Sequence, residues 1–145
     1  MHLSAKLKYA ICAMLELGLH YRKQYVSVTV IAEKRSIPGP FLEKLLLQLK
    51  EAGLTKSRRG PDGGYSLALA PEKIRVGDIF TAVEGPVNFT EGFEAQESYE
   101  LVTFFAEVEE NVREVLNSKT LQELCTHARK YKKLTQPTHS HPFFI

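Results

Sequence analysis

Apolar residues recur every three or four positions through the first fifty residues, a spacing that predicts three helices. The first helix begins near Ser4 and the second after Ser27, and serine is a good N-cap at both points. Pro38 stops the second helix, and Pro40 opens the third at a position where its missing N–H breaks no hydrogen bond. The apolar stripes are Leu3, Leu7, Ala10, Ile11, Met14 and Leu15 in the first helix, Ile31 and Ala32 in the second, and Phe41, Leu42, Leu45, Leu46 and Leu49 in the third.

Residues 54–69 change to the pattern of a β-hairpin. Residues 61–64 read Pro-Asp-Gly-Gly, which is strong turn chemistry because the glycines accept positive φ. Tyr65, Leu67 and Leu69 then alternate with smaller residues, and residues 54–57 supply a short partner strand. Arg58 and Arg59 follow that strand directly, so we expect them to project from the tip of the hairpin.

The second half of the chain predicts three more helices. A short one runs from about Gly77 to Glu84 on the stripe of Val76, Ile79, Phe80 and Val83. Residues 86–97 show no periodicity and predict a loop, after which a long helix spans residues 98–117. Thr120 and Glu123 form a capping box that opens the last helix. Its apolar stripe includes Cys125, which we interpret as an inert core thiol.

The long helix carries apolar residues at steps of four and three positions, the spacing of a coiled-coil seam. This seam consists of Leu101, Phe105, Val108, Val112 and Val115, and Phe104 and Leu116 widen it. The seam either packs on the chain's own domain or forms a two-fold homodimer interface. The glutamate-rich outer faces of the helix favour the homodimer.

Composition limits the class of protein. A chain of 145 residues with 43% hydrophobic content suits one domain. It has no apolar run long enough for a transmembrane helix, so we expect no membrane partner, and Lys6, Lys8 and Glu16 interrupt the apolar N-terminus in a way that argues against a signal peptide. Two cysteines make no disulfide framework, which predicts a cytoplasmic protein.

Charge is divided unevenly along the chain. Residues 1–60 hold 11 Lys and Arg against 4 Asp and Glu, whereas residues 61–145 hold 8 against 13. A basic front predicts a polyanionic partner for the first half of the chain, unless the asymmetry is a chance feature of a small protein.

The order of elements predicts a mostly α fold with a small β-hairpin: a winged helix-turn-helix followed by a long dimerisation helix. In such a unit the second helix of the pair fits a DNA major groove, and the hairpin wing lies along the neighbouring backbone or minor groove. We therefore expect double-stranded DNA as the partner. The expected division is a DNA-binding domain over 1–85, an effector loop over 86–97, dimerisation and C-terminal helices over 98–134, and a flexible tail over 135–145.

Four segments carry specific motifs in a fixed order: MHLSAKLKYAICAMLELG, IAEKRSIPGPFLEKLLLQLKEAGL, SRRGPDGGYSLA and IRVGDIFTAVEG. In these segments, which cover about the first 85 residues, the chain resembles the Rrf2 family of bacterial transcriptional regulators. The resemblance implies a cytoplasmic homodimer that binds a palindromic operator, most commonly as a repressor. It also implies the DNA-contacting residues: Pro40, Phe41, Glu43 and Lys44 in the major groove, Arg59 in a groove at the wing, and Arg58, Ser4, Lys6 and Tyr9 on the backbone.

The chain departs from that family in one respect. Many members hold a [2Fe–2S] cluster on three cysteines in the loop before the long helix, but that loop has no cysteine here. Three-cysteine ligation is therefore excluded, and we expect no cofactor. A weaker alternative is an unconventional cluster at Cys12, with Glu91 or Glu94 as a further ligand.

Other sensors and other functions stay open. The loop residues Phe89 and Phe93, with Tyr99, either line a pocket for a small-molecule or protein effector or pack against the core. The tail residues His139 and His141 are too sparse a pair for a structural zinc site. A winged-helix module that binds another protein is the alternative to DNA binding, and no constellation of residues predicts an enzyme.

Overall fold

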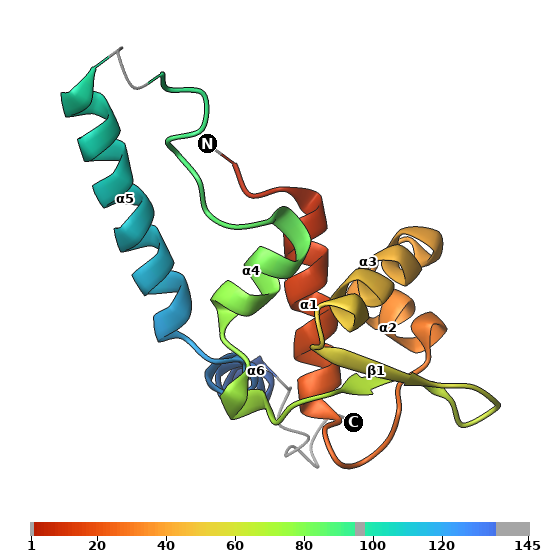
Figure 1. The fold of residues 1–145 in the computed structure, drawn as a ribbon. Helices are drawn as coiled ribbons and strands as arrows, with labels where there is room; N and C mark the ends of the chain where they lie inside the picture. The colour runs from red at the N-terminus through yellow and green to blue at the C-terminus, as the bar shows by residue number, and fades with distance from the viewer. Residues whose placement is uncertain (1, 95–97, 136–145) are drawn as a thin grey trace, which may run out of the picture.

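The computed structural model describes residues 2–94 and 98–135 (Figure 1). Ser4 and Ser27 cap the first two helices as predicted, each accepting a hydrogen bond from the backbone N–H three residues on. The elements are α1 (Ala5–Leu19), α2 (Val28–Arg35), α3 (Gly39–Glu51), β1 (Thr55–Arg58), β2 (Gly64–Leu67), the 3₁₀ turn η1 (Pro71–Lys73), α4 (Val76–Glu84), α5 (Tyr99–Ser118) and α6 (Leu121–Thr135). The predicted fold class is confirmed.

The hairpin is an antiparallel pair that projects from one side of the helical body (Figure 1). Thr55 pairs with Leu67 at its base, and Arg58 pairs with Gly64 next to the turn. Val26, in the connection before α2, extends the sheet because its N–H and C=O both bond to Tyr65, each at 2.8 Å. The wing is therefore anchored to the start of α2 as well as to the end of α3.

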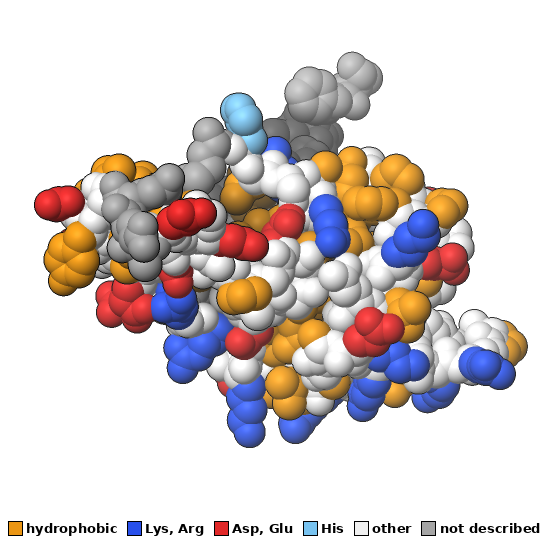
Figure 2. Space-filling view, turned by 45° about the horizontal axis from the view of Figure 1, so that its top comes forward, with side chains coloured by type: hydrophobic (Ala, Val, Ile, Leu, Met, Phe, Trp, Pro, Cys, Tyr) orange, Lys and Arg blue, Asp and Glu red, His pale blue; other side chains and the backbone are white. Residues whose placement is uncertain are grey.

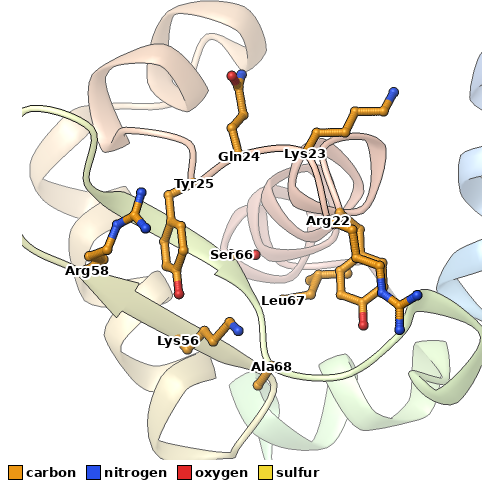
Figure 3. Close-up of a pocket in the computed structure, with 10 residues that line it drawn as sticks. Arg22, Lys23, Gln24, Tyr25, Lys56, Arg58, Ser66, Leu67 and Ala68 are labelled. Carbon is orange, nitrogen blue, oxygen red and sulfur yellow. The ribbon is translucent and has the colours of Figure 1, made fainter.

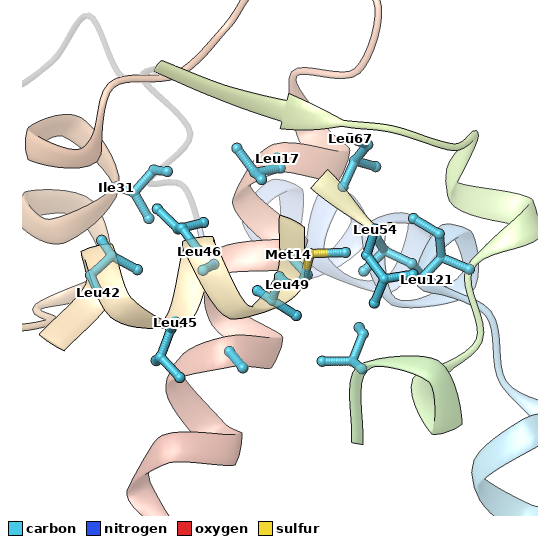
Figure 4. Packing of buried hydrophobic residues seen from close by; sticks show 14 of the residues in the cluster. Met14, Leu17, Ile31, Leu42, Leu45, Leu46, Leu49, Leu54, Leu67 and Leu121 are labelled. Atoms are coloured by element: carbon cyan, nitrogen blue, oxygen red, sulfur yellow. The ribbon is translucent and has the colours of Figure 1, made fainter. Parts of the chain in front are cut away.

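The core forms around α1, whose Met14 and Leu17 meet the buried leucines of α3 and Leu67 of β2 (Figure 4). The last helix joins this core: Leu121 and Cys125 of α6 are completely buried. Gly18 allows that approach, because a Cβ at this position would lie 2.6 Å from Cys125 Sγ. The structure thus places an element from beyond residue 98 inside the winged-helix core.

Several details of the predicted pattern are wrong. Arg58 is the last residue of β1 and does not follow the strand, and Phe41 of the predicted apolar stripe keeps 37% of its surface exposed. The first stripe began at Leu3, which lies before α1 and is 60% exposed. The strict alternation over 65–69 also fails, since Ser66 is only 8% exposed whereas Leu69 is 41% exposed. The strand ends at Leu67, so Leu69 lies beyond the sheet, and the segment 21–26 covers the face that Ser66 presents.

The long helix α5 stands at the edge of the molecule, on the side opposite the wing (Figure 1). It packs along α4 but contains no fully buried residue. Its C-terminal end is tied to the body, because the residues around the start of α4 pair with the connection to α6: Val76 N–H bonds Lys119 O at 2.9 Å, and Leu121 N–H bonds Ile74 O at 2.8 Å.

Within residues 2–94 and 98–135, no helix has the length and apolar character needed to cross a bilayer. His139 and His141, together with the rest of the tail from residue 136, lie outside the described residues.

Candidate nucleic-acid interface

The first turn of α3 presents a set of solvent-exposed side chains. Leu42, Leu45 and Leu46 turn inward and are buried, whereas Pro40, Phe41, Glu43 and Lys44 are all exposed. Pro40 occupies the first turn, as the sequence predicted. The helix thus buries one face in the core and leaves four of the predicted DNA-binding residues together on the surface.

Tyr9 of α1 supports the start of this helix. Its ring meets that of Phe41 edge to face, with centroids 5.7 Å apart. Tyr9 is half-buried and packs on the core, while Phe41 keeps 37% of its surface exposed. The structure therefore brings these two predicted residues together. Tyr9 positions the ring of Phe41 and is itself partly exposed.

Ser4 caps α1 as predicted, and it also makes a contact with α4 that the sequence did not predict. Its hydroxyl accepts the N–H of Leu7 at 3.1 Å and donates to the carboxylate of Glu84 at the end of α4. Lys6, in the first turn of α1, is half-buried and lies on the same end of the helix. The Lys6 side chain has no hydrogen bond or ion pair within the described residues, whereas the hydroxyl of Ser4 is already used as a cap.

The two wing arginines differ in environment. Arg58 donates to the backbone oxygen of Asp62 at 3.0 Å, and its guanidinium lies 4.3 Å from the ring centroid of Tyr25. Arg59 is exposed and has no hydrogen bond or ion pair within the described part of the chain. Gly63 permits this tight loop, because a Cβ there would lie 2.2 Å from the backbone oxygen of Arg58. The turn therefore secures Arg58 and leaves Arg59 free at the tip.

Basic side chains gather along one border of the molecule (Figure 2). Lys and Arg side chains follow one another along the lower edge of this view and reach the projecting wing at the right. Such an arrangement is the electrostatic footprint of a surface that binds a polyanion.

Sequence reasoning missed Glu16, the buried carboxylate that joins α1 to α2. Glu16 is 4% exposed, and its oxygens lie 2.9 Å from Arg35 Nε and 3.3 Å from Lys34 Nζ. Burial raises the pKa of Glu16, but the hydrogen bond from Lys34 and the charge of Arg35 outweigh it, so the pKa lies below its ordinary value of 4.5. The pair orients the last turn of α2, directly before the turn that leads to α3.

Tyr25 was also missed. It lies in the connection between α1 and α2, where two tyrosines among mostly polar residues give no periodic signal. The ring supports Arg58 and approaches Lys56, whose Nζ lies 5.9 Å from its centroid.

The predicted seam of the long helix is partly buried and partly exposed to solvent. Phe105, Val108 and Val112 are half-buried, and Phe105 stacks on Phe93 of the preceding loop with centroids 5.7 Å apart. The exposed part of the seam is an apolar edge formed by Leu101, Phe104 and Val115, which are 48%, 57% and 67% exposed. This apolar edge lies beside the face that packs along α4, so the helix has surface left for a partner.

The loop before α5 offers aromatic contacts and carboxylates but no thiolate. The backbone N–H of Phe89 donates to Glu109 at 3.2 Å and the ring of Phe93 stacks on Phe105, whereas Tyr99 is 81% exposed and does not help to enclose a pocket. Glu91 and Glu94 are exposed, whereas Cys12 packs against the core.

Within residues 2–94 and 98–135, no three His, Cys, Asp or Glu side chains converge as metal ligands. Burial raises the pKa of the Cys125 thiol, which disfavours a thiolate there. With two cysteines in the sequence, the three-thiolate ligand set is absent.

Comparison with known proteins identifies relatives along most of the chain. Residues 3–127 match the family model Rrf2, described as an iron-dependent transcriptional regulator. The HTH-type transcriptional regulator CymR of Bacillus subtilis is 35% identical over 127 residues, which cover 88% of this chain and 91% of that relative. The HTH-type transcriptional regulator IscR of Erwinia tasmaniensis is 36% identical over 129 residues, covering 86% and 78%.

Solved structures agree with this result. The structure of CymR, the global cysteine regulator of B. subtilis, superposes with a TM-score of 0.78 at 33% identity, over 88% of this chain and 98% of that one. T. potens IscR gives a TM-score of 0.78 at 35% identity, over 91% of each chain. These relatives support DNA binding and give no support to a protein-interaction module that lacks it.

Proposed function

The chain belongs to the Rrf2 family and is a DNA-binding transcriptional regulator, not an enzyme; from this premise we propose that it acts as a homodimer that reads a palindromic operator with α3 and the wing. The observation that carries the proposal is the exposed first turn of α3 beside a wing whose Arg59 has no partner within the described residues.

The residues that contact base edges in this proposal are those of the first turn of α3 and Arg59. Glu43 accepts hydrogen bonds, which suits the amino group of a cytosine in the major groove, and Lys44 beside it suits a phosphate or a guanine. Arg59 enters the groove beside the wing, and the ring of Tyr25 holds Arg58 against the hairpin for a backbone contact. Lys6 and Tyr9 contact the backbone at the start of α1, and Ser4 contributes by capping that helix.

The apolar edge of α5 supports the homodimer. Leu101, Phe104 and Val115 are large, exposed and on one side of the helix, and a two-fold partner would bury them against the same residues of its own α5. Two winged helices in one dimer read two half-sites, whose spacing follows the repeat of the DNA helix. A bacterial regulator of this kind works in the cytoplasm, and one that covers an operator without an activating surface acts as a repressor.

The switch of this regulator does not use a three-cysteine cluster. The whole sequence has two cysteines, Cys12 and Cys125, and the second is buried in the core. We infer an effector of another kind, either a small molecule or a partner protein. Protein purified without oxygen should therefore be colourless and free of iron. Brown protein whose iron disappears in Cys12→Ala would contradict this inference.

The experiment that tests the proposal is selection of bound duplexes from a random pool, followed by affinity measurements at several salt concentrations. We expect a palindromic consensus, and an affinity that falls with salt with a slope of about −0.9 per phosphate contacted. Equal affinity for the selected and random duplexes would overturn sequence-specific binding.

A further inference from the structure

A cavity of about 380 Å³ lies between the outer face of the hairpin and the connection from α1 to α2 (Figure 3). Tyr25 borders it on one side, Arg22 on the other, and the β2 residues Ser66 and Leu67 lie between them. All the charged side chains that line this cavity are cations: Arg22, Lys23, Lys56 and Arg58.

The cavity is separate from the surface of α3. Ser57 faces α3, since its hydroxyl accepts a hydrogen bond from Lys50 Nζ at 2.7 Å. Successive side chains of a strand point to opposite faces, so Lys56 and Arg58 project from the other face of β1. Lys56 and Arg58 are therefore directed away from α3.

The positive charge in this cavity is not neutralised within the described chain. Ion pairs there involve only Glu16, Glu109 and Glu110, none of which lines the cavity. Aromatic rings hold the cations instead: Arg58 and Lys56 lie over Tyr25 at 4.3 and 5.9 Å, and Arg22 lies 5.5 Å from the centroid of Tyr21. Arg22 also has a φ of +62°, in the left-handed region that non-glycine residues seldom adopt.

We propose that this cavity binds a phosphate group, held by Arg22, Lys56 and Arg58 beside the ring of Tyr25. A phosphate carries up to two charges and several acceptor oxygens, which matches several cations at one site, and the arginine fork fits its geometry. The cavity has room for more than the phosphate itself, so it can admit a phosphate that is part of a larger molecule. That molecule is either DNA that flanks the operator or a free phosphorylated metabolite.

The first arm of the test uses no DNA, so its failure is distinct from failure of the proposed function. Amide shifts are recorded by NMR at low salt while inorganic phosphate, and then adenosine 5′-monophosphate, is added. We expect saturable shifts at residues 21–25 and 56–58, with affinity reduced about tenfold in Lys56→Gln and Arg22→Gln, because each change removes a charged hydrogen-bond donor. Lys130→Gln on α6 removes the same charge elsewhere and should leave the affinity unchanged.

The second arm compares a selected operator duplex with one that extends further on both sides. If the phosphate belongs to flanking DNA, the extra length raises affinity in the wild type and not in Lys56→Gln. If it belongs to a metabolite, adenosine monophosphate binds in the first arm and duplex length has no effect. The proposal is overturned if Lys56→Gln and Arg22→Gln match the wild type in both arms.

Discussion

Glu16 on α1 and Arg35 on α2 form an ion pair in which the carboxylate is almost fully buried and the guanidinium is partly exposed, with 2.9 Å between Oε2 and Nε. Because Lys34 shares the same carboxylate, one acidic side chain orients the end of α2. Removing one partner of such a buried ion pair destabilises a protein strongly, because the remaining charge is left without a partner.

Replacing Glu16 by Gln should lower the free energy of unfolding by about 1–3 kcal/mol, because Arg35 and Lys34 lose their charged partner while remaining partly hydrated. Urea unfolding at neutral pH measures the change. Glu33→Gln, which removes an exposed carboxylate from α2, the helix that carries Lys34 and Arg35, is the control and should change stability by less than about 0.5 kcal/mol.

Glu16 also predicts that the free energy of unfolding decreases at acidic pH. The pKa of Glu16 is lower in the folded state than its ordinary 4.5, so its contribution is complete above 4.5 and is lost as the pH falls through the folded value. Stability of the wild type should therefore decline more steeply below pH 4.5 than that of Glu16→Gln. Parallel curves for the two proteins would show that the pair does not stabilise the fold.

Arg59→Ala should weaken binding to a selected operator by about 1–3 kcal/mol if the side chain reads a base. Fluorescence anisotropy with labelled duplex gives the affinity, and loss of discrimination at one base pair identifies the base that is read. Lys130→Ala removes a cation from α6 and controls for total charge. A uniform loss over all sequences would assign Arg59 to a phosphate instead.

Gly18→Ala should destabilise the protein by about 1–3 kcal/mol, because the new Cβ would lie 2.6 Å from Cys125 Sγ in a core that is already filled. Removing the sulfur relieves this contact, so the double variant with Cys125→Ala should be more stable than the sum of the two single changes. Thermal unfolding of all four proteins completes the cycle. Additive effects would mean that α1 and α6 do not meet at this pair.

Phe104→Glu should convert a dimer to a monomer, because it places a charge in the apolar edge of α5. Sedimentation measures the oligomeric state, and half-site cooperativity on DNA should be lost with the dimer. Ala106→Glu, at an exposed position outside the seam, is the control. A variant that stays dimeric would move the interface away from α5.

Periodicity, caps and turn residues were enough to predict the helices and the hairpin, since these signals are local. Ser27, Pro40 and Thr120 each mark a helix start that the structure confirms. Glu16 could not be predicted in the core, because a carboxylate within an apolar stripe is buried only where cations from another helix reach it. The contact of Gly18 with α6 could not be predicted either, because Cys125 lies far along the chain and nothing local to Gly18 indicates it.

The candidate DNA surface could likewise be predicted only where local sequence determines it. The helical period predicts the exposure of Glu43 and Lys44 but not that of Phe41, and the position of Arg59 follows from the turn. The environment of Arg58 does not, because Tyr25 lies thirty-three positions earlier in a segment without periodicity. Contacts between distant segments set which of two neighbouring arginines is held and which is free.

The burial of Leu121 and Cys125 against α1 also determines how this protein can be divided. A fragment that ended after α5 would retain every residue predicted to touch DNA, yet it would leave an apolar opening where α6 fills the core. The shortest stable DNA-binding fragment must therefore extend through α6. Exchange of α5 and α6 together for those of a relative would likewise succeed only if the incoming α6 fits against Gly18.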